Sequence, residues 1–123
     1  MVLADYDTML SGKNQKYLSK EKTVAVQVNT LDNLLQRNGI NHVNWIKIDV
    51  EGAELDVLKG AHNILSNSKD ISILIEIHGI SHLYEPVIKL LRSYNFKIEF
   101  EKSFRYQRQN MTGGRNVLLR KSV

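Results

Sequence analysis

The 123-residue sequence has no cysteine, a single proline and no apolar run of membrane-spanning length. Without cysteine the chain has no disulfide framework, no thiolate zinc site and no cysteine nucleophile. A transmembrane helix needs roughly 20 apolar residues, and the first residues also lack the apolar core of a signal peptide. We therefore expect a cytoplasmic protein that does not enter the membrane.

The excess of positive over negative charge is also small. Seventeen Lys and Arg stand against 13 Asp and Glu, which gives a net charge of +4. The excess permits an anionic partner, but it is not gathered in a long run, so we do not expect nucleic-acid binding. The length predicts a single domain, residues 1–123, and the strand and helix patterns described below make it an α/β domain. The chain is long enough to form a hydrophobic core but short for a doubly wound enzyme.

The most informative stretch begins at Trp45. Residues 45–50 (WIKIDV) are apolar and β-branched, which indicates a strand buried in a parallel sheet. Apolar residues then recur at helical spacing from Val57 to Leu65, so a helix follows almost without a loop. The carboxyl end of such a strand is where open α/β sheets bind ligands.

Three acids crowd this strand end: Asp49, Glu51 and Glu54, with Gly52 available for a tight turn. Two carboxylates about 5 Å apart repel by roughly 3 kcal/mol at an effective dielectric near 20. This repulsion is enough to raise one pKa or to favour a bound cation. Alternatively, Glu51 and Glu54 only complement the helix dipole, but that does not account for Asp49.

A second buried strand is predicted at residues 71–77 (ISILIEI), directly before His78. A helical crossover makes the two strands parallel neighbours, so Asp49, Glu76 and His78 are expected at one sheet edge. Glu76 then needs a cation, a lysine or a substrate group as partner, unless it is open to water. His78 suits a general base or a metal ligand, or it is a loop residue bonded to backbone.

The other elements follow from turn signals and periodicity. We expect a loop at residues 6–22, strands at 23–29, 96–101 and 116–120, and helices starting at Thr30 and near Ser81. A hairpin between the last two strands returns the polar loop 102–115 to the ligand edge. This loop carries Arg105, Arg108 and Arg115, which bind an anionic substrate group if they face the site and are otherwise solvated.

Three sequence blocks together resemble FkbM-like methyltransferases, class I enzymes that use S-adenosylmethionine. They are residues 30–35 (TLDNLL), 46–54 (IKIDVEGAE) and 75–78 (IEIH), in the family's order. The resemblance implies a Rossmann-like sheet, mostly parallel with an antiparallel C-terminal hairpin. It also implies O-methylation of a hydroxyl on a sugar, glycan or secondary metabolite. The candidate catalytic residues are Asp49, Glu76 and His78, and the candidate substrate-binding residues are Glu51, Arg105, Arg108 and Arg115.

The resemblance covers the C-terminal half of such a domain, without its first strands. Glycines occur at positions 12, 39, 52, 60, 79, 113 and 114, and none forms the glycine-rich cofactor loop. We therefore assign no cofactor-binding residue and no metal, and expect weak or no S-adenosylmethionine binding and no activity by this chain alone. The strand edge with Trp45 and Ile48 lacks a neighbour in this half, which favours a homo-oligomer paired through that edge.

Two other functions stay open on the sequence. A non-catalytic assembly or binding module would use the exposed sheet edge to bind a partner. A metal-dependent hydrolase or nuclease would use the strand-end acids to hold magnesium.

Overall fold

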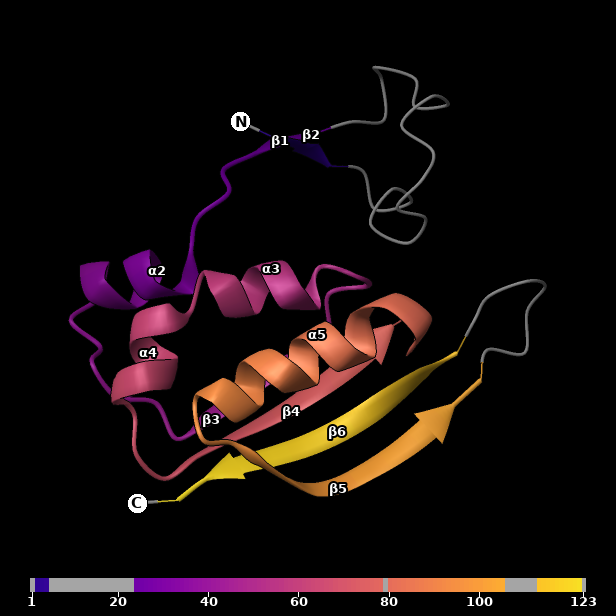
Figure 1. Cartoon of the computed structure of the whole chain (residues 1–123). Helices are drawn as coiled ribbons and strands as arrows, with labels where there is room; N and C mark the ends of the chain where they lie inside the picture. Colours follow the sequence, from indigo (N-terminus) through magenta and orange to yellow (C-terminus); the bar gives the residue numbers. More distant parts are fainter. Residues whose placement is uncertain (1, 5–23, 79, 106–112, 123) are drawn as a thin grey trace.

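The computed structural model describes residues 2–4, 24–78, 80–105 and 113–122. It contains a four-stranded sheet with helices on one side and a separate two-stranded sheet (Figure 1). The elements in chain order are β1 (Val2–Ala4), β2 (Val24–Val26), α2 (Leu31–Arg37), β3 (Trp45–Ile48), α3 (Glu54–Lys59), α4 (His62–Asn67), β4 (Ile71–His78), α5 (Ile80–Ser93), β5 (Lys97–Phe104) and β6 (Gly114–Lys121).

The strand order of the main sheet is β3-β4-β6-β5. β3 and β4 are parallel, whereas β6 is antiparallel to both β4 and β5. The α/β class, the parallel pair and the antiparallel C-terminal hairpin are confirmed, but the expected mostly parallel pairing is wrong for this sheet. The reason is that β6 returns from β5 as a hairpin and inserts between β4 and β5, which replaces a parallel pairing by two antiparallel ones.

The N-terminal strands form a sheet of their own. β2 is shorter than the predicted strand 23–29, and it pairs in antiparallel fashion with β1. The loop expected at residues 6–22 lies outside the described residues. No helix in the described part of the chain is long and apolar enough to cross a membrane.

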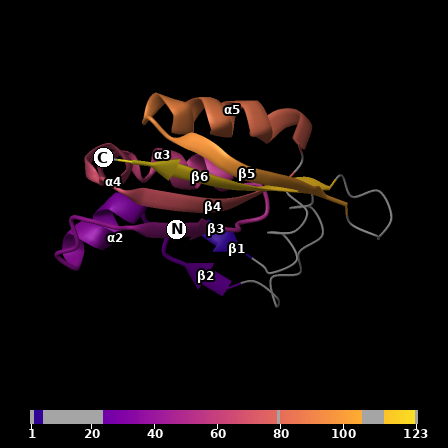
Figure 2. The same cartoon turned by 90° about the horizontal axis from the view of Figure 1, so that it is seen from below.

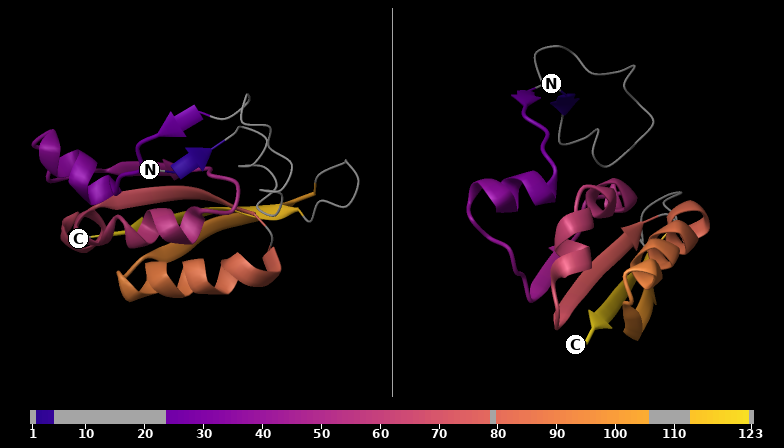
Figure 3. Two further views of the ribbon diagram at one scale, coloured as in Figure 1. Left: turned by 90° about the horizontal axis from the view of Figure 1, so that it is seen from above. Right: turned by 60° about the vertical axis from the view of Figure 1, so that its left-hand side comes forward.

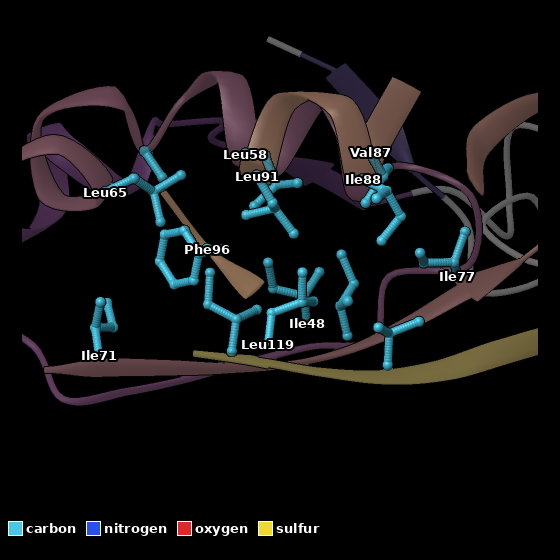
Figure 4. Packing of buried hydrophobic residues seen from close by; sticks show 14 of the residues in the cluster. Ile48, Leu58, Leu65, Ile71, Ile77, Val87, Ile88, Leu91, Phe96 and Leu119 are labelled. Atoms are coloured by element: carbon cyan, nitrogen blue, oxygen red, sulfur yellow. The ribbon is translucent and has the colours of Figure 1, made fainter. Parts of the chain in front are cut away.

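The hydrophobic core fills one face of the main sheet (Figure 4). In β4 every second residue from Ile71 to Ile77 is fully buried, as the two-residue period of a strand requires. Leu58 of α3 and Leu91 of α5 pack on these isoleucines from above. Figure 3 shows from two further directions that α3, α4 and α5 lie on the same side of the strands.

The single helix predicted after Gly52, with its end near Leu65, is broken into α3 and α4. The Asp32 carboxylate accepts hydrogen bonds from the backbone N–H groups of Asn63 (2.8 Å) and Ile64 (3.0 Å) in the first turn of α4. It thereby caps a helix whose own N-cap residue, Ala61, makes no side-chain hydrogen bond. Gly60 at the break lies against Thr30, since a Cβ there would come within 3.2 Å of the Thr30 Cβ.

Candidate functional site at the carboxyl ends of β3 and β4

The candidate site lies where the parallel pair β3–β4 ends. Ile48, the last residue of β3, is opposite Ile75, so Asp49 and Glu76 follow side by side in the register. β4 continues for two more residues, to His78, which pairs with Gly114 at the start of β6. The sheet therefore brings Asp49, Glu76 and His78 to one edge, as the sequence predicts.

A tight turn after Asp49 places Glu51 over this edge. Glu51 and Gly52 both have positive φ, at 52° and 107°. For a residue other than glycine this left-handed conformation costs about 1 kcal/mol. The turn brings Glu51 Oε2 to 3.4 Å from His78 Nε2. The strained backbone conformation of Glu51 therefore places its carboxylate beside the His78 ring.

Glu54, in the first turn of α3, is the most deeply buried acid of the site. Its side chain is 0% exposed, and its Oε1 lies 2.8 Å from His78 Nδ1. The same oxygen accepts a hydrogen bond from the Gly52 backbone N–H at 3.0 Å. A buried carboxylate is stable only with such partners, so Glu54 joins the turn, the helix and the end of β4. It is thus more than a complement to the helix dipole.

Sequence reasoning did not include Glu54 among the site residues, although a signal was present. Glu54 precedes Leu58 by four residues, which places both on the same face of the helix. Leu58 belongs to the apolar stripe that contacts the sheet. A glutamate at a stripe position is buried, and a buried glutamate requires a partner.

His78 is surrounded by three glutamates. Its Nδ1 contacts Glu54, and its Nε2 lies 3.4 Å from both Glu51 Oε2 and Glu76 Oε1. Burial by itself lowers the pKa of His78, but the hydrogen bond to Glu54 and the charges of the three glutamates outweigh it and raise the pKa. Because a carboxylate only accepts, we place a proton on Nδ1, which directs Nε2 toward Glu51 and Glu76.

Asp49, Glu51 and His78 each offer one ligand atom within 4.8 Å of the others, a grouping that could hold a cation. Exposed acidic groups are common without an ion, and Asp49 is exposed. We therefore assign no metal to this site.

The three candidate arginines are placed differently. Arg115, opposite Ile77 in the sheet, has its guanidinium 4.8 Å from the ring centre of Tyr84 and its Nη1 3.5 Å from Glu101 Oε2. The Tyr84 hydroxyl donates to the same carboxylate at 2.6 Å. Arg105 is exposed at the end of β5, and Arg108 lies outside the described residues. Arg115 is therefore held by protein groups, with its side chain 33% exposed.

The raised pKa of His78 predicts a pH dependence of stability. A histidine whose pKa is raised on folding contributes stability that is fully present below its unfolded pKa of about 6.5. This contribution is lost as the pH rises through the folded pKa. We expect the ring signals of His78 in NMR spectra to titrate with a midpoint above about 6.5. The free energy of unfolding should fall as the pH rises through that midpoint.

The control for this titration is the His78→Gln variant, whose unfolding free energy should lack that decrease. A His78 midpoint at or below about 6.5 would contradict the arrangement of glutamates around the ring.

The carboxyl ends of parallel strands are where open α/β sheets bind their ligands, and the carboxylates and His78 lie at such an edge. Comparison with known families is more specific, since the family described as "Methyltransferase FkbM domain" matches residues 3–98. The chain belongs to this family. The match includes the whole turn from Asp49 to Glu54, together with His78.

A curated relative is the hexuronic acid methyltransferase AglP of Haloferax volcanii, which is 33% identical over 86 residues. The alignment covers 69% of this chain but 34% of the relative, so the chain spans about a third of the relative's length. No solved structure gives a significant match to the chain.

Proposed function

We propose that this chain forms the acceptor side of an S-adenosylmethionine-dependent O-methyltransferase with a Rossmann-like sheet. The acceptor is a hydroxyl of a sugar, glycan or secondary metabolite. The observation that carries the proposal is His78, bonded to buried Glu54 and flanked by Glu51 and Glu76 where β3 and β4 end. Membership of the methyltransferase family supports it.

The proposed chemistry is the removal of one proton from the acceptor. S-adenosylmethionine supplies an activated methyl group, so the protein has to align the acceptor oxygen and accept its proton. The acceptor O–H bond breaks, and its proton moves to the partly exposed carboxylate of Glu76, which lies 3.4 Å from the buried Nε2 of neutral His78 and can pass the proton to it. Glu51 and Glu76 stabilise the imidazolium that forms, and Glu54 keeps the ring oriented through Nδ1. Asp49, exposed beside Glu76, is placed to bind a second hydroxyl of the acceptor.

An acidic sugar is the acceptor class that we favour within this proposal. The name of the Haloferax relative specifies a hexuronic acid, which has both hydroxyl groups and a carboxylate. The carboxylate needs a cation, and arginine binds it through two parallel hydrogen bonds. Arg105 is exposed at the end of β5 and is available for this contact, with Arg108 and Arg115 as further candidates.

The chain by itself is not expected to hold S-adenosylmethionine. No glycine of the described residues lies in a glycine-rich loop between a strand and a helix of the main sheet. Gly52 follows β3, but it is separated from α3 by Ala53 alone, and the first residue of α3 is Glu54 of the acidic site. We therefore propose no residue for the cofactor and expect no methyl transfer by the chain alone.

NMR titration of the chain with glucuronic acid tests the acceptor site. We expect the His78 ring signals to shift with a Kd of about 1 mM, which corresponds to a binding free energy of about −4 kcal/mol. Glucose, which lacks the carboxylate, should bind more weakly, and the His78→Gln variant should lose the response of the site. Calorimetry with S-adenosylmethionine should give no binding tighter than about 1 mM.

The titration with glucuronic acid and the calorimetry with S-adenosylmethionine test separate parts of the proposal. Glucuronic acid that leaves His78 unchanged would contradict the acceptor site. Micromolar binding of S-adenosylmethionine to the isolated chain would contradict the absence of a cofactor site.

A second candidate function, assembly, is favoured by the free edge of β3. In the described sheet β3 pairs with β4 alone, and Trp45 on this strand is 64% exposed. An unpaired strand edge is a template for another chain, so a homo-oligomer joined through β3 remains our proposal for the partner.

A further inference from the structure

A cavity between α2 and α4 lies away from the site around His78. Its volume is about 380 Å³, within the range of roughly 300–1,000 Å³ that is typical of small-molecule sites. Figure 1 and Figure 2 both show α2 and α4 side by side near the start of β4, at the opposite end of the strand from His78. The eight residues of β4 rise by about 3.3 Å each, so His78 lies roughly 23 Å from the start of the strand. The cavity is therefore separate from the acidic site.

The floor of this cavity is apolar and is formed mainly where α2 ends. Gly39 has a φ of +68°, and its backbone N–H donates to the Gln36 carbonyl at 3.1 Å. The backbone N–H of Ile40 donates to the Leu35 carbonyl at 2.9 Å. These two bonds form a Schellman motif, which places an apolar residue after the glycine against the third-last residue of the helix. Leu35 and Ile40 therefore lie together, and Ile64 of α4 completes the floor.

The rim of the cavity carries four side-chain amides. They belong to Gln36 on α2, Asn41 in the following loop, and Asn63 and Asn67 on α4. Asn63 and Asn67 are four positions apart, so the helix directs both to the same side. All four residues are exposed, and within the described part of the chain none of their side chains is hydrogen-bonded to another protein group. We call the cavity the amide pocket, after these four residues.

Asp32 supplies a negative charge to the amide pocket and joins its two walls. Its carboxylate oxygens accept hydrogen bonds from the backbone N–H groups of Asn63 and Ile64, at 2.8 and 3.0 Å. These bonds fix α2 against α4, so the walls are held in place before a ligand binds. A carboxylate has about four acceptor positions, so Asp32 can still accept from a ligand hydroxyl. Its charge disfavours an anionic ligand.

We propose that the amide pocket binds a neutral hexose unit of a glycan. Amides both donate and accept hydrogen bonds, as sugar hydroxyls do, and the C–H face of a hexose ring packs on the apolar floor. Among the described residues that line the pocket none is basic or aromatic. An anionic sugar would lack a cation there, and a nucleoside would lack a ring or an arginine on which its base can stack.

The exposure of the rim bears on the source of the sugar. Because the four amides face solvent, the units on either side of a bound hexose have room to leave the pocket. A unit within a glycan chain therefore fits as well as a free sugar. The proposal rests on α2 and α4 and does not depend on methyl transfer at His78.

NMR titration of the chain with glucose tests the proposal through the side-chain amide signals of Gln36, Asn63 and Asn67. We expect a saturable shift with a Kd of about 1 mM. Glucuronic acid should bind here about threefold more weakly, because Asp32 repels its carboxylate. This is the reverse of the order expected at His78. Maltotriose, which holds the same hexose within a chain, should bind at least as tightly as glucose.

A pair of matched double variants locates the binding site. Gln36→Ala combined with Asn63→Ala removes two rim amides and should weaken glucose binding about tenfold, since each neutral hydrogen bond contributes a factor of roughly 2–10. Asn33→Ala combined with Ser66→Ala changes exposed polar residues of the same two helices outside the pocket, and should leave binding unchanged. Circular dichroism checks that both stay folded. If the first double variant does not fold, Asn41→Ala tests the same rim from the loop.

Four results would overturn the binding of a neutral hexose. They are no saturable shift up to about 50 mM glucose, an equal loss in the control variant, tighter binding of glucuronic acid at the amide signals, or tighter binding of adenosine. Exclusion of maltotriose would overturn the assignment to a glycan unit. The measurement reports on α2 and α4 and not on His78, so its failure leaves the proposed methyl transfer untouched.

Discussion

Replacing Glu54 by alanine is expected to lower the free energy of unfolding by about 3–5 kcal/mol, because it removes one partner of a buried ion pair and leaves His78 without its Nδ1 acceptor. A domain of this size is stabilised by only about 5–15 kcal/mol, so the variant should lose a large share of its stability. Urea denaturation followed by circular dichroism measures the loss.

The more conservative Glu54→Gln variant separates charge from shape. Glutamine fills the same space but gives up the charge-assisted hydrogen bond, which is worth about 1.5–3 kcal/mol. The pKa of His78 should fall in this variant because its strongest raising contact is lost. Asp56→Asn, an exposed change in the same helix, is the control and should cost less than about 1 kcal/mol. A loss in Glu54→Gln no larger than the loss in this control would contradict the buried pair.

Gly114→Ala is the second substitution with a large expected effect. Gly114 is buried at the start of β6, opposite both His78 and Phe104. An added Cβ would clash with the carbonyl oxygen of Ile77 and with the Phe104 ring. The carbonyl oxygen belongs to the backbone of β4, so it cannot move away as a flexible side chain could. Overpacking of this kind costs about 1–3 kcal/mol where side chains can yield, so we expect about 3 kcal/mol or more here.

The control for Gly114→Ala is Gly39→Ala. Gly39 has a φ of +68° and open space around its Cβ position, so alanine meets backbone strain of about 1 kcal/mol but no clash. Thermal unfolding of both variants compares the two costs. Equal losses would show that the space at Gly114 is less restricted than the backbone of Ile77 indicates.

Local sequence patterns were sufficient to predict the parallel pair and which side chains lie together at its end. The strand at residues 45–50 is followed at once by a helix, and a helical connection places the next strand parallel beside it. This reasoning placed Asp49, Glu76 and His78 at one edge, and the register of β3 and β4 agrees. Membership of the methyltransferase family, first inferred from three sequence blocks, is also confirmed.

The features that were not predicted depend on contacts between distant residues. The break between α3 and α4 depends on the Asp32 carboxylate, about thirty positions earlier, at hydrogen-bond distance from the first turn of α4. β6 lies between β4 and β5 in the sheet. The alternation of side chains along a strand predicts which face is buried, but it does not predict which strands are neighbours. The contact of Arg115 with Tyr84 likewise exists only because β6 occupies that position.

The interior place of β6 also governs the order in which the protein assembles during synthesis. β6 leaves the ribosome after both β4 and β5, yet in the described sheet these two strands are joined through it. Until residues 114–121 emerge, the β4 edge and the whole of β5 have no hydrogen-bonding neighbour in this sheet. Pairing between segments so far apart in the chain is slow, and unpaired edges attract other nascent chains. A chain interrupted before residue 114 would therefore lack the strand that joins β4 to β5.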